Sequence, residues 1–142
     1  MTEKAREKKT SASTKAKTTP ELFLAKCTPA MQPVFTSILD EATRRSYTIY
    51  WGTTGFSVRT TINGTLTSFL YGYPPDRLEV YTGYLPVDED GREHLRADWL
   101  KLGVFRRQGE HTLRAILAGN LPANVDAAFS AVMDQVDTLI QG

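Results

Sequence analysis

The sequence predicts an α+β fold in which helices pack on a single antiparallel sheet. Two observations support this. Residues 47–84 hold short runs of β-branched and aromatic residues that alternate with polar ones, and Asn63-Gly64 among them is typical of a tight type I′ hairpin turn. Residues 29–45 and 124–140 instead carry apolar residues at helical spacing. The predicted order is a helix, an antiparallel four-stranded meander, a helix, one or two further strands and a C-terminal amphipathic helix.

The first predicted helix starts where a hydroxyl side chain precedes a proline. Thr28 can cap the helix and Pro29 suits its first position, and the apolar spacing then continues to residue 45. Residues 21–26 favour one short preceding helical turn. The four strands of the meander are predicted at residues 47–51, 55–61, 65–71 and 77–84, which are separated by segments rich in Gly, Pro, Asn and Asp.

The last third of the chain has weaker strand signals between two helices. Leu95, Trp99 and Leu102 recur at helical spacing before Gly103, a residue suited to a helix end, so they predict a second helix. Residues 104–107 and 111–117 predict a second hairpin. Asn124 is the expected cap of the terminal helix, which shows the most continuous apolar spacing of the chain.

Length and composition indicate one folded domain with a basic leader. The chain has 142 residues, of which 41% are hydrophobic, which fits a single core. We expect a single α+β domain over residues 21–142. Residues 1–20 have little to bury, so a disordered basic tail is expected there. Residues 1–19 have a net charge of 6 − 2 = +4, from two glutamates and from Lys4, Arg6, Lys8, Lys9, Lys15 and Lys17.

Strict alternation along the meander assigns its side chains to two faces. One face is apolar and is predicted to be the core face; it consists of Phe56, Val58, Leu66, Leu70, Leu78 and Val80. The other face is mixed and consists of Ser57, Arg59, Thr67, Phe69, Tyr71, Arg77, Glu79 and Tyr81.

The mixed face suggests a contact surface. The predicted binding residues are Tyr50, Arg59, Tyr71, Arg77 and Tyr81, with Phe69 beside them. Aromatic and arginine side chains gathered on one sheet face can bind a protein partner, or can stack unpaired bases and bind phosphates. The alternative is that one or two helices cover this face, so that its aromatic residues belong to the core and its arginines lie at the edge.

No motif in the sequence identifies an enzyme, a cofactor or a metal site. Asp76 and Glu79 suggest a nuclease-type magnesium site, but Tyr81 stands where that motif needs lysine and the two acids are too close in sequence. A calcium loop starting at Asp88 would need a glutamate at the position of Trp99.

The histidines and the cysteine also match no catalytic or disulfide pattern in the sequence. His94 and His111 lie in different predicted elements and match no catalytic signature. Cys27 is the single cysteine, so an intrachain disulfide is excluded and a reducing cytoplasm is the expected location. Residues 1–19 contain no apolar region of a signal peptide, and no later apolar stretch approaches the roughly 20 residues that span a bilayer. Neither secretion nor insertion into a membrane is therefore expected.

The sequence favours a non-enzymatic protein-interaction module that self-associates and resembles a chaperone or an adaptor. It is expected to bind a protein partner or to form a homodimer. The predicted order of elements resembles that of the small secretion chaperones, which are heart-shaped α+β dimers; this resemblance is architectural and assigns no functional residue. One alternative is a nucleic-acid-associated accessory protein that uses the basic tail from Lys4 to Lys17 and the mixed sheet face. A second is a small enzyme with a site near Asp76, Glu79 and His111.

Overall fold

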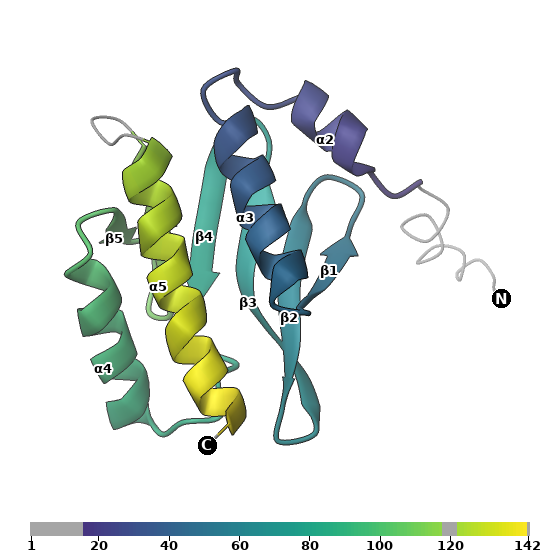
Figure 1. The fold of residues 1–142 in the computed structure, drawn as a ribbon. Coiled ribbons are helices and arrows are strands. Elements are labelled where there is room, and N and C mark those ends of the chain that lie inside the picture. Colours follow the sequence, from purple (N-terminus) through teal and green to yellow (C-terminus); the bar gives the residue numbers. More distant parts are fainter. Residues whose placement is uncertain (1–15, 118–121, 142) are drawn as a thin grey trace, which may run out of the picture.

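The computed structural model describes residues 16–117 and 122–141, and its fold is shown in Figure 1. Its described residues form one six-stranded antiparallel sheet and four helices, which confirms the predicted α+β class. The strands are ordered β1-β2-β3-β4-β6-β5 across the sheet. The elements are α2 (Pro20–Ala25), α3 (Gln32–Arg44), β1 (Thr48–Trp51), β2 (Phe56–Ile62), β3 (Thr65–Tyr73), β4 (Arg77–Tyr81), α4 (Glu89–Leu100), β5 (Phe105–Arg107), β6 (Thr112–Ala115) and α5 (Pro122–Gln141).

The N-terminal part of the described chain is tied to the sheet edge. Thr18 is buried, and its main-chain N–H donates to the Gly52 oxygen at 2.8 Å. Thr19 then caps α2 by accepting a hydrogen bond from the Leu22 N–H at 3.2 Å. Residues 1–15, which contain most of the predicted basic tail, lie outside the described residues.

The central hairpin forms around the predicted turn. Asn63 and Gly64 have positive φ angles of 53° and 81°, the backbone that a type I′ turn requires. Ile62 and Thr65 on either side of the turn are paired with each other. The turn therefore fixes how β2 and β3 align.

A β-bulge changes the predicted side-chain pattern of β3. The pairing of β2 with β3 shifts between Val58 and Arg59, and Phe69 is the extra residue opposite this step. Phe69 and Thr67 are therefore buried in the structure, while Leu66 is 52% exposed. The faces predicted for these three residues are wrong, because one inserted residue reverses the alternation on one side of it.

Helices α3 and α5 lie side by side across one face of the sheet, and α4 flanks α5 (Figure 1). Both central helices bury an apolar stripe against the strands, as their spacing predicts. The Trp99 indole N–H of α4 donates to the Gln135 side-chain oxygen of α5. The buried stripe of α3 and α5 consists of Val34, Phe35, Ile38, Ala42, Val125, Ala128, Phe129, Val132, Met133 and Val136.

Two helix starts differ from the predicted ones. Asp88 caps α4 by accepting a hydrogen bond from the Gly91 N–H at 2.8 Å, so this helix begins well before Leu95. Helix α5 begins at Pro122, so Asn124 lies inside its first turn and is not its cap. In both cases residues that favour turns are absorbed into a helix whose apolar face is buried.

The predicted cap Thr28 forms a turn before α3. Its hydroxyl accepts a hydrogen bond from the Met31 N–H at 3.3 Å, while the regular helix begins at Gln32. The second predicted hairpin is confirmed as β5 and β6, and Gly103 before it has a φ of +81°, as expected of a residue that ends a helix.

A polar cluster joins the C-terminal end of α3 to α5. The Arg45 side chain is 14% exposed and forms ion pairs with Glu41 at 2.6 Å and Asp137 at 2.7 Å. The Tyr47 hydroxyl shares its hydrogen bond between the Met133 main-chain oxygen, at 3.1 Å, and the Asp137 carboxylate. Burial and the neighbouring Asp137 raise the pKa of Tyr47, so its hydroxyl stays a donor at physiological pH.

Removing this hydroxyl is expected to destabilise the fold. We predict that Tyr47→Phe lowers the free energy of unfolding by about 1–2 kcal/mol, because acceptors on α5 lose a buried donor. Urea unfolding followed by tryptophan fluorescence measures the change. The matched control is Tyr84→Phe, since Tyr84 is 61% exposed and its hydroxyl has no hydrogen bond within the described chain. Equal midpoints for the two variants would contradict the prediction.

Candidate functional site

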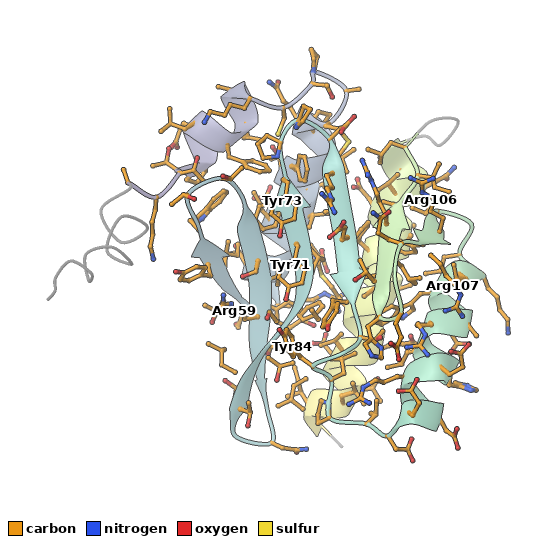
Figure 2. The ribbon with its side chains drawn as sticks, turned by 180° about the vertical axis from the view of Figure 1, so that it is seen from behind. Arg59, Tyr71, Tyr73, Tyr84, Arg106 and Arg107 are labelled. Carbon is orange, nitrogen blue, oxygen red and sulfur yellow. The ribbon has the colours of Figure 1, made fainter. Side chains whose placement is uncertain are left out.

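The sheet face opposite α3 and α5 carries no helix within the described chain, and Figure 2 looks onto it. Strand pairing places one row of side chains across all six strands of this face, because directly paired residues share a face. The row runs Tyr50, Ser57, Tyr71, Glu79, Arg114 and Arg106. We call this face the platform; it comprises that row, Tyr84 from the loop after β4, and Arg59, Ser68, Tyr73, Arg77, Tyr81 and Thr112 on neighbouring positions.

All five predicted binding residues lie on the platform; they are Tyr50, Arg59, Tyr71, Arg77 and Tyr81. Phe69 does not, because the bulge turns it into the core, where its ring lies 5.4 Å from that of Tyr47. The alternative prediction that helices cover this face is wrong for the described chain, since α3 and α5 both use the other face (Figure 1).

The sequence-based prediction of the binding set missed four tyrosine and arginine residues of the platform. Tyr73 was outside it because β3 was predicted to end at residue 71. Tyr84 was predicted within the strand of residues 77–84, whereas β4 ends at Tyr81 and Tyr84 lies in the loop after it. The alternation of β3 continues past Gly72 to Tyr73, which pairs with Arg77. Arg106 and Arg114 reach the platform only because β6 pairs with β4, a contact between distant segments that the local sequence does not encode.

The tyrosines form a connected cluster in the middle of the platform. The Tyr81 ring lies 6.4 Å from Tyr71, 5.0 Å from Tyr84 and 6.0 Å from His111, and each pair meets at a steep angle between the ring planes. The Tyr71 hydroxyl donates to the Ser68 hydroxyl at 3.1 Å. Burial raises the pKa of Tyr71, which keeps this phenol protonated.

Cationic side chains lie over Tyr50 and Tyr73. The Arg59 guanidinium carbon is 4.3 Å and the Lys17 ammonium 4.2 Å from the centre of the Tyr50 ring. Arg77 similarly lies 5.6 Å from the Tyr73 ring centre. These cation–π contacts hold flexible side chains in place and occupy ring faces that a ligand would otherwise use.

Positive charge exceeds negative charge on the platform. Glu79 is its single carboxylate, and Arg77 already forms an ion pair with it at 2.6 Å. Arg59, Arg106 and Arg114 have no ion pair with a carboxylate among the described residues. The arrangement can therefore accept anionic groups from a partner without breaking an existing ion pair.

Two hollows flank the central tyrosines, and Tyr71 and Tyr73 line both of them. The larger hollow, of about 350 Å³, is open and is lined by β1, β2, the loop between them and β3, with Tyr50 and Arg59 among its residues. The smaller, of about 250 Å³, lies over β4 and β6. Figure 2 shows Tyr73, Tyr71 and Tyr84 along the middle of the face, with Arg59 to one side and Arg106 to the other. The platform can thus accept side chains on both sides of a tyrosine ridge.

The residues of the predicted enzyme site do not gather. Asp76 precedes β4, while His111 lies beyond its other end, where the Thr82 N–H donates to the His111 oxygen at 2.9 Å. Glu79 lies between them on β4 and is bound to Arg77. The described residues also contain no group of three His, Cys, Asp or Glu side chains placed to hold a metal ion.

His111 belongs to a structural cluster under the platform edge. The Arg96 side chain, 4% exposed, donates to His111 Nδ1 at 3.1 Å and forms an ion pair with Glu89 at 3.1 Å and another with Glu93. Hydrogen bonds from Arg96 lower the pKa of Glu89 and Glu93. Because every group has a partner, this cluster fixes the position of His111 beside Tyr81.

Comparison of this chain with models of protein families, with curated proteins and with solved structures finds no match. The resemblance to secretion chaperones therefore stays a prediction from the order of elements. Within residues 16–117 and 122–141, no helix combines the length and apolar character needed to cross a membrane.

Cys27 is expected to be chemically inert. It is 7% exposed, its Sγ donates to the Phe23 oxygen at 3.3 Å, and burial, with a smaller effect of Asp76, raises its pKa to about 11. Its thiolate fraction near neutral pH is then about a hundredfold below that of the unfolded chain. We predict slow alkylation of Cys27 by iodoacetamide in the native protein and fast alkylation in urea; equal rates would contradict this.

The raised pKa of Cys27 also predicts a change of stability with pH. The free energy of unfolding, measured by urea unfolding, should fall as the pH rises from about 9 to 11, because the unfolded chain loses the thiol proton first.

Proposed function

We propose that this protein is a non-enzymatic protein-interaction module that binds a polypeptide segment of its partner on the platform. The observation that carries the proposal is a sheet face that no helix of residues 16–117 and 122–141 covers, on which tyrosine and arginine side chains extend across all six strands (Figure 2). Tyrosine and arginine contribute most to binding energy at protein interfaces, because they combine large contact areas with hydrogen-bond donors. The two hollows offer places for side chains of the partner.

The geometry of the rings favours a polypeptide over a nucleic acid. Base stacking needs an open aromatic ring face. Lys17 and Arg59 lie over Tyr50, and Arg77 lies over Tyr73. The remaining tyrosines meet one another at steep angles. These contacts leave fewer open ring faces for base stacking, which favours a peptide.

A nucleic-acid-associated role is the second candidate, and one contact favours it. Lys17 lies over Tyr50 at the β1 edge, so the basic sequence that precedes it joins the folded domain beside the platform. That sequence contains Lys4, Arg6, Lys8, Lys9 and Lys15, which could bind phosphates.

The terminal helix is a less suitable partner surface than the platform. Its apolar stripe, including Phe129, Val132 and Val136, is buried against the sheet and α3. Only Ile140, which is 39% exposed, leaves a large apolar side chain accessible near its end. Binding by α5 would therefore require the core to open.

Selection from a phage-displayed library of random peptides tests the proposed function. We expect the full chain to select peptides whose affinity falls about tenfold or more for Tyr50→Ala/Tyr84→Ala, which removes one exposed aromatic ring near each hollow. Leu22→Ala is the matched control, since Leu22 is 55% exposed on α2, away from the platform. Hydrogen exchange should show bound peptides protecting β3 and β4. Failure to select any peptide, or protection confined to α3 and α5, would contradict the proposal.

Self-association is the second part of the proposal, and the β1 edge supports it. β1 pairs with β2 alone, which leaves its other edge without a strand in the described chain. Free strand edges can pair between copies. We expect light scattering after size-exclusion chromatography to give about twice the monomer mass of 15.8 kDa at high protein concentration. A mass that stays at the monomer value over the whole concentration range would contradict self-association.

A further inference from the structure

Arg106 and Arg114 form an unusual pair at the β5 side of the platform. They lie directly opposite each other on β5 and β6, where like charges destabilise strand pairing. The next residue in the row, Glu79, pairs with Arg114 in register but gives its carboxylate to Arg77. Two adjacent guanidinium groups are therefore left without a carboxylate in the described chain.

Within residues 20–142 the surplus of positive charge lies on the platform. It carries Arg59, Arg77, Arg106 and Arg114 against Glu79, which gives 4 − 1 = +3. From residue 20 on, the other residues include 7 basic and 13 acidic ones, or 7 − 13 = −6. The platform is thus a positive face on a negative domain, which attracts an acidic segment and repels a basic one. It also repels the same face of a second copy.

We propose that the segment bound on the platform is an acidic stretch of polypeptide in extended conformation. Its carboxylates would bind Arg106 and Arg114 at one end and Arg59 at the other, with side chains between them in the two hollows. This inference rests on the proposed function and specifies the chemistry of the partner.

The length of the row sets the length of the segment. Tyr50 and Arg106 are separated by five strand spacings. At about 4.8 Å per spacing the row is about 24 Å long, which an extended peptide of about seven residues spans. Arg59 on β2 lies three strand spacings from Arg114 and four from Arg106, so the acidic groups of the segment are expected about four to six residues apart.

The test uses the full chain and compares peptide selections by charge variants. The probe is a phage-displayed library of random peptides, selected separately on the wild type, Arg106→Gln/Arg114→Gln and Arg106→Glu/Arg114→Glu. We expect wild-type selection to enrich Asp and Glu, the Gln variant to bind those peptides about tenfold more weakly, and the Glu variant to select Lys and Arg instead. Arg44→Gln is the control, since its side chain is 71% exposed on α3. Circular dichroism verifies that each variant is folded.

The possible outcomes distinguish failure of the acidic-segment inference from failure of the proposed peptide binding. Selected peptides that protect β3 and β4 but show no acidic enrichment would overturn the acidic segment and leave the binding function intact. A library that yields no peptide would overturn both. Oligothymidylate that displaces an acidic peptide and binds more tightly would assign the platform to nucleic acid and overturn the inference.

Discussion

One-sided burial of the sheet is the constraint on which the rest of the structure depends. The apolar side chains of the strands gather on one face, where Phe56, Val58 and Leu70 lie under α3 and α5. Once both helices pack there, the C-terminal helix has buried its own apolar stripe as well. The opposite face can then carry tyrosine and arginine side chains at little cost to the core, since exposed ones such as Tyr50 and Tyr84 stay in contact with water and the buried Glu79 is paired with Arg77.

The bulge between β2 and β3 decides which aromatic residues belong to each face. Without the extra residue, alternation would place Phe69 beside Tyr71 on the platform and would turn Leu66 toward the core. With it, Phe69 contacts Tyr47, and Tyr47 in turn binds α5 through Asp137. A local irregularity thus adds a ring to the core and leaves the platform with tyrosines, whose hydroxyl groups tolerate water.

The sequence predicts what neighbouring residues determine, and long-range pairing determines the rest. The Asn63-Gly64 turn, the helical stripes and the shared face of Tyr50, Arg59 and Tyr71 follow from local spacing. The bulge and the insertion of β6 between β4 and β5 do not, because they depend on contacts between distant segments. This is why the sequence alone could neither assign Arg114 to the platform nor show that the platform lacks a helix.

For the proposed peptide binding, the platform combines a rigid centre with a free end. Arg59 and Arg77 are already held over tyrosine rings, and Tyr71 is half-buried and hydrogen-bonded, so ordering them on binding loses little conformational entropy. Arg106 and Arg114 are bound to no carboxylate of the described chain, and so they can reach an anionic group. Under the proposed function, a centre fixed in advance would provide contact area for many peptides, whereas the free guanidinium pair would distinguish them by charge. Selectivity would then follow from the β5 and β6 side of the sheet, and affinity from its middle strands.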